Sequence, residues 1–137
     1  GIESLLRRHG LKPVVLQDQL NKGRTIIEKF EQEAEPAGYA VILLTPDDYG
    51  FAAVELKKDL AAREGRYRAR QNVIFELGYF VAKLGRSHVC AILTGEVEQP
   101  SDNSGVLYLR AEPSLDAIKL DLLREIASAG LPVDFVM

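Results

Sequence analysis

Short apolar segments separated by stretches of helical periodicity are the feature of this sequence that most restricts its fold. Three of four such segments are continuously apolar rather than alternating, which is typical of parallel strands covered by helices on both faces. Alternating strand and helix patterns predict a doubly wound α/β sheet. The expected strands are PVVLQ (13–17), YAVILLT (39–45), HVCAILT (88–94) and GVLYLR (105–110).

Helical patterns lie between and around these segments. TIIEKFEQEAE begins with a Thr25-x-x-Glu28 capping box, which predicts a helix start at Thr25. The segment PSLDAIKLDLLREIASAG has apolar residues at helical spacing and ends at Gly130, and Gly10 similarly closes IESLLRRHG.

The chain opens with a helical pattern rather than a strand. In the flavodoxin-like strand order 2-1-3-4-5, the first strand is central. If residues 13–17 form the second strand, we expect the first strand to be missing from this chain and the true N-terminus to lie roughly 15–25 residues upstream. The alternative is a four-strand sheet that begins with an edge helix. Either arrangement makes residues 1–137 a single domain.

Composition narrows the possible partners and the compartment. The net charge of −3 gives no reason to expect nucleic acid or an anionic membrane as partner. No run approaches the roughly 18 apolar residues of a membrane span. One cysteine, Cys90, excludes an internal disulfide and suits the cytoplasm. His9 and His88 are the only histidines, and neither stands at metal-ligand spacing from other ligands, so we expect no metal.

Glu76 is an unusual residue in an apolar helical segment, QNVIFELGYFVAKLG (71–85). A 3.6-residue period places it on one narrow polar stripe with Asn72, Tyr79 and Lys83. Such a stripe is either the solvent-facing edge of a buried helix or part of a site. Gly78 favours a site, because an interior glycine costs about 1 kcal/mol relative to alanine and often marks close approach by a backbone or a ligand.

The segment LTPDDYG follows an expected strand directly, where ligands bind in open α/β sheets. Asp47 and Asp48 could accept hydrogen bonds from sugar hydroxyl groups, although a plain Pro-Asp turn explains the composition equally well. In the segment 16–25, Gly23 and Arg24 next to a helix N-terminus could hold a phosphate, a weak signal.

Four arginines precede the Glu76 helix. They form either a solvated charge run or a clamp for pyrophosphate or an acidic neighbour. They are Arg63, Arg66, Arg68 and Arg70.

Three segments together resemble the bacterial TIR-like domains described as predicted nucleotide-binding proteins of antiphage defence. These include fusions to STING-like cyclic-dinucleotide sensors. The segments are NKGRTIIEKFE, AVILLTPDDYG and RARQNVIFELGYFVAKLGRSHVCAIL. The resemblance implies a flavodoxin-like TIR fold and hydrolysis of NAD to nicotinamide and ADP-ribose, or to a cyclised form. It matches the catalytic glutamate of the family to Glu76.

The same resemblance implies NAD as the substrate, no cofactor, homo-oligomerisation through contacts between TIR domains, and a fused cyclic-nucleotide sensor. The residues that we expect to line the pocket are Thr45, Pro46, Asp47, Asp48, Arg70, Asn72 and Tyr79. The loop expected to contact a neighbouring copy contains Gln17, Asp18, Asn21, Gly23 and Arg24.

Two alternatives remain open on the sequence alone. One is a non-catalytic TIR module that binds nucleotides or self-associates for signalling. The other follows from the looser similarity of FELGYF to the E-x-G-Y-A segment of nucleoside deoxyribosyltransferases, whose glutamate also acts on an N-glycosidic bond. That reading predicts turnover of free nucleosides rather than NAD.

Overall fold

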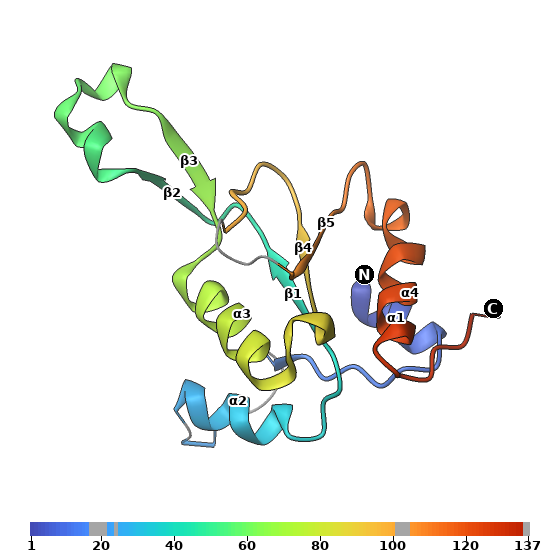
Figure 1. The fold of residues 1–137 in the computed structure, drawn as a ribbon. Helices are drawn as coiled ribbons and strands as arrows, with labels where there is room; N and C mark the ends of the chain where they lie inside the picture. Colours follow the sequence, from blue (N-terminus) through green and yellow to red (C-terminus); the bar gives the residue numbers. More distant parts are fainter. Residues whose placement is uncertain (17–21, 24, 101–104, 136–137) are drawn as a thin grey trace.

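A computed structural model shows a central parallel sheet of three strands with helices on both faces (Figure 1). The structure describes residues 1–16, 22–23, 25–100 and 105–135. The strands are β1 (Ala40–Leu44), β4 (Val89–Leu93) and β5 (Leu107–Arg110), in the order β1-β4-β5. Ala40 pairs with Val89, and Cys90 pairs with Leu107. This arrangement confirms the predicted α/β fold and corresponds to strands 3-4-5 of the expected order.

Two apolar clusters hold the layers together, one on each face of the sheet. On one face, α3 (Gln71–Leu84) packs Leu77 and Phe80 onto alternate residues of β1 and β4. On the other face, α1 (Ile2–Arg8) and α4 (Lys119–Ser128) pack around Cys90 and Ile92. All five residues of β4 are therefore buried, which explains its continuously apolar sequence.

Helix α2 (Ile26–Ala34) lies against α3 rather than against the sheet (Figure 1). Thr25 Oγ1 accepts a hydrogen bond from the Glu28 amide at 3.1 Å, and the Thr25 amide donates to Glu28 Oε1 at 3.0 Å. The predicted capping box is thus confirmed. Phe30 anchors the helix, because its ring contacts the rings of Phe75, Tyr79 and Phe80.

The strand predicted at residues 13–17 was wrong over Pro13–Leu16, and Gln17 lies outside the described residues. A strand needs a neighbour to complete its ladder of hydrogen bonds. Among the described residues, β1 pairs only with β4, and its other edge has no strand beside it.

A two-stranded antiparallel hairpin, absent from the sequence prediction, leaves the sheet after β1. It consists of β2 (Asp48–Phe51) and β3 (Gly65–Arg68), joined through the 3₁₀ helices η2 (Ala53–Lys57) and η3 (Leu60–Ala62). Figure 1 shows it projecting from the body as an arm. Two further 3₁₀ helices in the described part of the chain are η4 (Arg86–His88) and η5 (Leu115–Ala117).

Candidate functional site

Glu76 lies in the second turn of α3, at the side of its core-facing residues and close enough to α2 for Lys29 to act on its charge. Leu77, the next residue, is 1% exposed and faces the core. Glu76 itself is partly buried, and this burial raises the pKa of its carboxyl group. The positive charge of Lys29 on α2 opposes that rise. The carboxylate is therefore held in a poorly hydrated position beside one cation.

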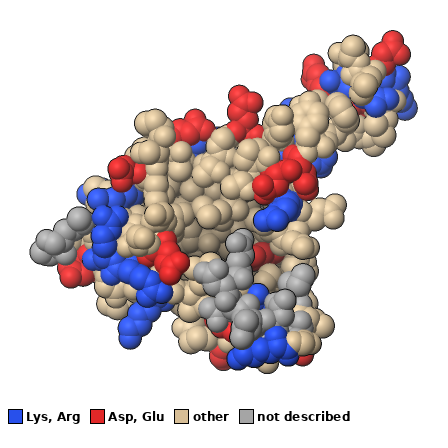
Figure 2. Space-filling model, turned by 180° about the vertical axis from the view of Figure 1, so that it is seen from behind, with Lys and Arg blue, Asp and Glu red and all other residues tan. Residues whose placement is uncertain are grey.

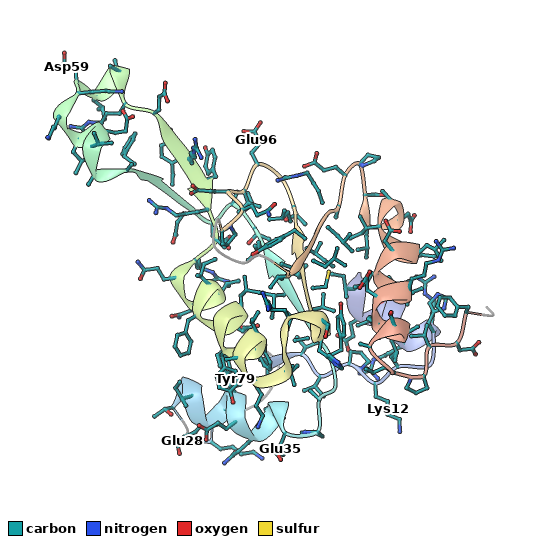
Figure 3. All side chains as sticks on the ribbon, in the orientation of Figure 1. Lys12, Glu28, Glu35, Asp59, Tyr79 and Glu96 are labelled. Carbon is teal, nitrogen blue, oxygen red and sulfur yellow. The ribbon has the colours of Figure 1, made fainter. Side chains whose placement is uncertain are left out.

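The polar stripe of α3 faces helix α2 along most of its length. The Tyr79 ring lies 5.5 Å from the Phe30 ring, and Lys83 Nζ lies 3.6 Å from Glu35 Oε2 (Tyr79 and Glu35 are labelled in Figure 3). Asn72, in the first turn, is exposed. Glu76 and Tyr79 are partly buried, and α2 contacts this side of α3, so the stripe is not a simple solvent-facing edge at these two residues.

A second group of predicted residues meets where β1 ends and α3 begins. Asp47 accepts a hydrogen bond from the Thr45 hydroxyl group, and its Oδ2 lies 3.5 Å from Arg70 Nε. Arg70 is the residue at which α3 starts. Pro46 is exposed, and its ring lies near Gly95. The structure thus brings Thr45, Asp47 and Arg70 together.

Two open hollows are found along the hairpin, and Glu76 lines neither of them. The one at the base of the hairpin, of about 450 Å³, is lined by Asp47, Asp48, Tyr49, Arg68, Ala69 and Gln71. The other lies further along and includes Glu55, Glu64, Arg66 and Glu98. The prediction that Glu76 and the Thr45–Asp48 segment line one pocket stays a prediction, since these two hollows include Asp47 and Asp48 but not Glu76.

The arginine cluster is ordered by individual contacts rather than forming one clamp. The Arg66 guanidinium lies 3.6 Å from the Glu98 carboxylate, and the Arg68 guanidinium lies across Gly50. Arg63 donates to the backbone carbonyls of Lys58 and Leu56. Three of the four arginines lie on the hairpin, which separates them along its length.

Residues 1–113 match the family model described as the CAP12/Pycsar effector protein, TIR domain. The chain belongs to this TIR family. The resemblance inferred from NKGRTIIEKFE, AVILLTPDDYG and RARQNVIFELGYFVAKLGRSHVCAIL is thereby confirmed.

Three relatives extend the comparison. The TIR domain is 44% identical over 134 residues to the Escherichia coli (strain K12) protein YuaY, covering 98% of this chain and 42% of the relative. It is 28% identical over 127 residues to Protein tirC of Dictyostelium discoideum, covering 88% of this chain and 62% of the relative. It is 33% identical over 82 residues to the Pycsar effector protein PaPycTIR of Pseudomonas aeruginosa, covering 58% of this chain and 24% of the relative. The chain spans less than two thirds of each relative.

The loop that the resemblance assigned to assembly falls largely outside the described part of the TIR domain. Gln17, Asp18, Asn21 and Arg24 lie there, whereas Gly23 is exposed in a turn with φ +73°. At Gly78 a Cβ would meet no described atom within 4 Å, so no other part of the described backbone approaches it closely, and approach by a ligand stays a prediction.

The histidines of the TIR domain bond to the backbone. His9 Nδ1 lies 2.6 Å from the Asp134 carbonyl oxygen, and His88 Nδ1 lies 2.8 Å from that of Gly38. Within the described ranges, no group of three or more His, Cys, Asp or Glu residues is placed to hold a metal ion. No helix in this part of the chain is long and apolar enough to cross a membrane.

The hairpin is the feature that sequence reasoning missed. Its signal is an alternation of period two: Tyr49 and Phe51 in one strand and Tyr67 in the other alternate with polar residues or glycine. Their rings cluster, with Tyr49 4.8 Å from Tyr67 and 5.6 Å from Phe51. Glycine interrupts both strands, which hid the pattern.

Proposed function

We propose that this TIR domain is an NAD glycohydrolase that cleaves the bond between nicotinamide and ribose, with Glu76 as the catalytic residue. The observation that carries the proposal is the partly buried Glu76 carboxyl group, whose pKa is raised by lost hydration. Perturbed carboxyl groups of this kind are concentrated at catalytic sites. Membership of an effector TIR family supports the same assignment.

The proposed reaction needs little from the protein beyond one well-placed anion. The nicotinamide ring of NAD is cationic, so it leaves with the bonding electron pair as a neutral molecule and requires no general acid. Positive charge then develops at C1′ of the ribose, and a water molecule adds there and loses a proton. Glu76 in its ionised form would stabilise that developing charge, most strongly where apolar neighbours exclude water.

The charge of the substrate fits the state of Glu76. Burial favours the neutral acid, whereas a cationic ring beside the carboxyl group favours the ionised form. Substrate binding would therefore favour the ionised form of Glu76 that the reaction needs. Arg70, Asn72, Tyr79 and the Thr45–Asp48 segment are the proposed lining of the pocket, with NAD as substrate and no further cofactor.

As a biological role, we propose an effector of bacterial antiphage defence, active when copies assemble and linked to a sensor of cyclic nucleotides. The family description as a Pycsar effector and the similarity to PaPycTIR support this role. The choice between ADP-ribose and a cyclised product is left to product analysis.

The decisive experiment measures nicotinamide release from NAD by the assembled protein and by its Glu76→Gln variant. We expect loss of at least about a hundredfold in rate, since electrostatic stabilisation of this kind is typically worth that much. Glu31→Gln is the matched control, because Glu31 is an exposed glutamate on α2. Equal rates for the Glu76→Gln and wild-type proteins would refute the proposal, and turnover of free nucleosides would favour the deoxyribosyltransferase alternative.

One observation favours a second function, a non-catalytic TIR module that binds nucleotides or self-associates. Neither hollow along the hairpin is lined by Glu76, whereas one combines Asp48, Tyr49 and Arg68, groups able to contact ribose, base and phosphate. On this reading, Glu76→Gln would leave nucleotide binding and assembly unchanged, and no nicotinamide would appear with the wild-type protein.

A further inference from the structure

Lys29 is a partly buried cation on the side of α2 that meets α3. Its neighbours Ile27 and Glu28 are exposed, whereas Lys29 is partly buried and Phe30, the next residue, is buried against α3. Taking a charged group out of water is costly unless an opposite charge or a hydrogen bond compensates for it. The position of Lys29 therefore calls for an anionic partner on α3.

The Phe30 ring shows which residues of α3 meet α2. Its centroid lies 6.2 Å from that of Phe75, 5.5 Å from that of Tyr79 and 5.8 Å from that of Phe80. On a helix, positions i, i+1, i+4 and i+5 are neighbours on the surface. Glu76 is the fourth member of this group, and it therefore lies at the edge of the contact that Phe30 makes.

A second contact fixes the register of the two helices. Glu35 lies five residues after Phe30, and its Oε2 lies 3.6 Å from Nζ of Lys83, further along α3. Advancing along α2 therefore also advances along α3. Because Lys29 precedes Phe30, it is displaced toward the start of α3, on the side of Glu76 rather than of Lys83.

The other surroundings of Glu76 make Lys29 its counter-ion. The residues of β1 and β4 that pack against α3 are apolar. Acidic and basic side chains are interspersed on the face seen in Figure 2, so no broad field of one sign replaces a local partner there. Burial raises the pKa of Glu76, and the Lys29 charge opposes that rise. The other charged groups described on or beside α2 and α3 include Glu28, Glu31, Glu33, Glu35, Lys83 and Arg86.

We propose that Lys29 is a positioning residue, whose ammonium group holds Glu76 as an oriented carboxylate before substrate binds. This inference rests on the proposed hydrolysis of NAD. A desolvated carboxyl group favours its neutral form, which would not stabilise the positive charge that develops at C1′ of the ribose. A lysine suits the task, because its compact charge stands on a flexible stem that can withdraw when the cationic nicotinamide ring arrives.

This role gives Lys29 opposite effects at the two ends of the pH range. At acid pH, its charge keeps a larger fraction of Glu76 ionised and so favours the reaction. At higher pH, Glu76 is ionised with or without Lys29, while the lysine charge opposes the positive charge of the transition state. Rates with and without Lys29 should therefore cross as pH rises. A residue that only supported the fold would change the rate in one direction at every pH.

The first test is a carbon-13 NMR titration of the Glu76 carboxyl group in the 137-residue chain, with its signal identified by its loss in Glu76→Gln. Lys29→Met should raise the pKa of Glu76, because burial is then unopposed, and Lys29→Arg should keep the wild-type titration. Lys83→Met is the matched control, since Lys83 lies on the same stripe but pairs with Glu35. Lys29→Gln repeats the test if the methionine variant folds poorly. An unchanged Glu76 titration in folded Lys29→Met or Lys29→Gln would overturn the proposal.

The second test is the pH profile of kcat/KM for nicotinamide release by the assembled protein, which reports ionisation in the free enzyme. Lys29→Met should be at least about threefold slower than wild type at acid pH and at least as fast at alkaline pH. Lys29→Arg should restore the acid limb. An equal loss at every pH would contradict the positioning role. If Lys29→Met shifts the Glu76 titration but wild type releases no nicotinamide, the hold of Lys29 on Glu76 is supported and the proposed hydrolysis alone fails.

Discussion

Helix α2 covers the candidate site, and its N-terminal cap allows a direct test of how firmly it does so. In the wild-type protein, Thr25 Oγ1 accepts a hydrogen bond from the Glu28 amide at 3.1 Å. Thr25→Ala removes this acceptor and leaves the amide to water. Thr25→Ser keeps a hydroxyl group in the same place and is the matched control.

We expect Thr25→Ala to destabilise the helix by about 1 kcal/mol, the typical effect of replacing a threonine cap by alanine. If α2 unfolds with the whole domain, an unfolding entropy of about 2.1 cal/mol/K per residue over the chain converts this cost to a fall in Tm of about 3–4 °C. If its first turn opens separately, the open population rises about fivefold. The two cases have different observable consequences.

Thermal denaturation followed by circular dichroism measures the first effect, and amide hydrogen exchange at Glu28 measures the second. We expect one or both changes in Thr25→Ala and neither in Thr25→Ser. Exchange at Leu122, which is 0% exposed in α4, reports global unfolding alone. If the alanine and serine variants match in Tm and in Glu28 exchange, the capping box contributes nothing and the reasoning is refuted.

Three further predictions concern single side chains. Burial raises the pKa of Glu76 in the folded state above its ordinary value of 4.5, so the folded protein binds more protons than the unfolded chain and loses stability as pH rises from 4.5 through the folded-state pKa. Glu76→Gln should therefore raise Tm at pH 7 but not well below pH 4.5. An equal rise in Tm at both pH values would contradict this account. Leu77→Ala should lower the free energy of unfolding, measured by urea denaturation, by about 3 kcal/mol, because Leu77 is 1% exposed. Leu43→Ala should lower it by less than about 1 kcal/mol, because Leu43 is 47% exposed. Similar losses for the two variants would contradict the faces assigned to these residues. Burial, with a smaller contribution from Glu125, raises the pKa of the Cys90 thiol to about 12. Cys90 should therefore react with a disulfide reagent at pH 8 only after the protein unfolds. Rapid reaction of the native protein would contradict this prediction.

Local sequence signals were sufficient wherever the determining contacts are local. The capping box at Thr25 predicted the start of α2, because its two hydrogen bonds join residues three apart. The apolar run 88–94 predicted β4, whose five residues are all buried between helices. The rule that ligand sites lie beyond strand ends drew attention to the Thr45–Asp48 segment, but the ion pair between Asp47 and Arg70 was seen only in the structure.

Predictions from local sequence patterns were wrong or incomplete where contacts with a distant segment determine the structure. Residues 13–16 have an apolar composition that suits a strand, yet no described strand lies beside them to complete a ladder. The stripe through Glu76 and Tyr79 had the spacing of a polar helix edge, but periodicity does not say which element packs against an edge. The hairpin arm was hidden because Gly50 and Gly65 interrupt its alternation.

By itself, the sequence determined the α/β class, the places of the α helices and of the three strands of the parallel sheet, the TIR family and the choice of Glu76 as the residue to test. Each of these depends on spacing along the chain or on motifs that are contiguous in it. Only the tertiary structure decided that Glu76 faces Lys29 on α2, and that residues 48–68 project as an arm. Both outcomes depend on contacts between residues far apart in sequence or on their absence, and the free energy of such contacts is not recorded in any local pattern.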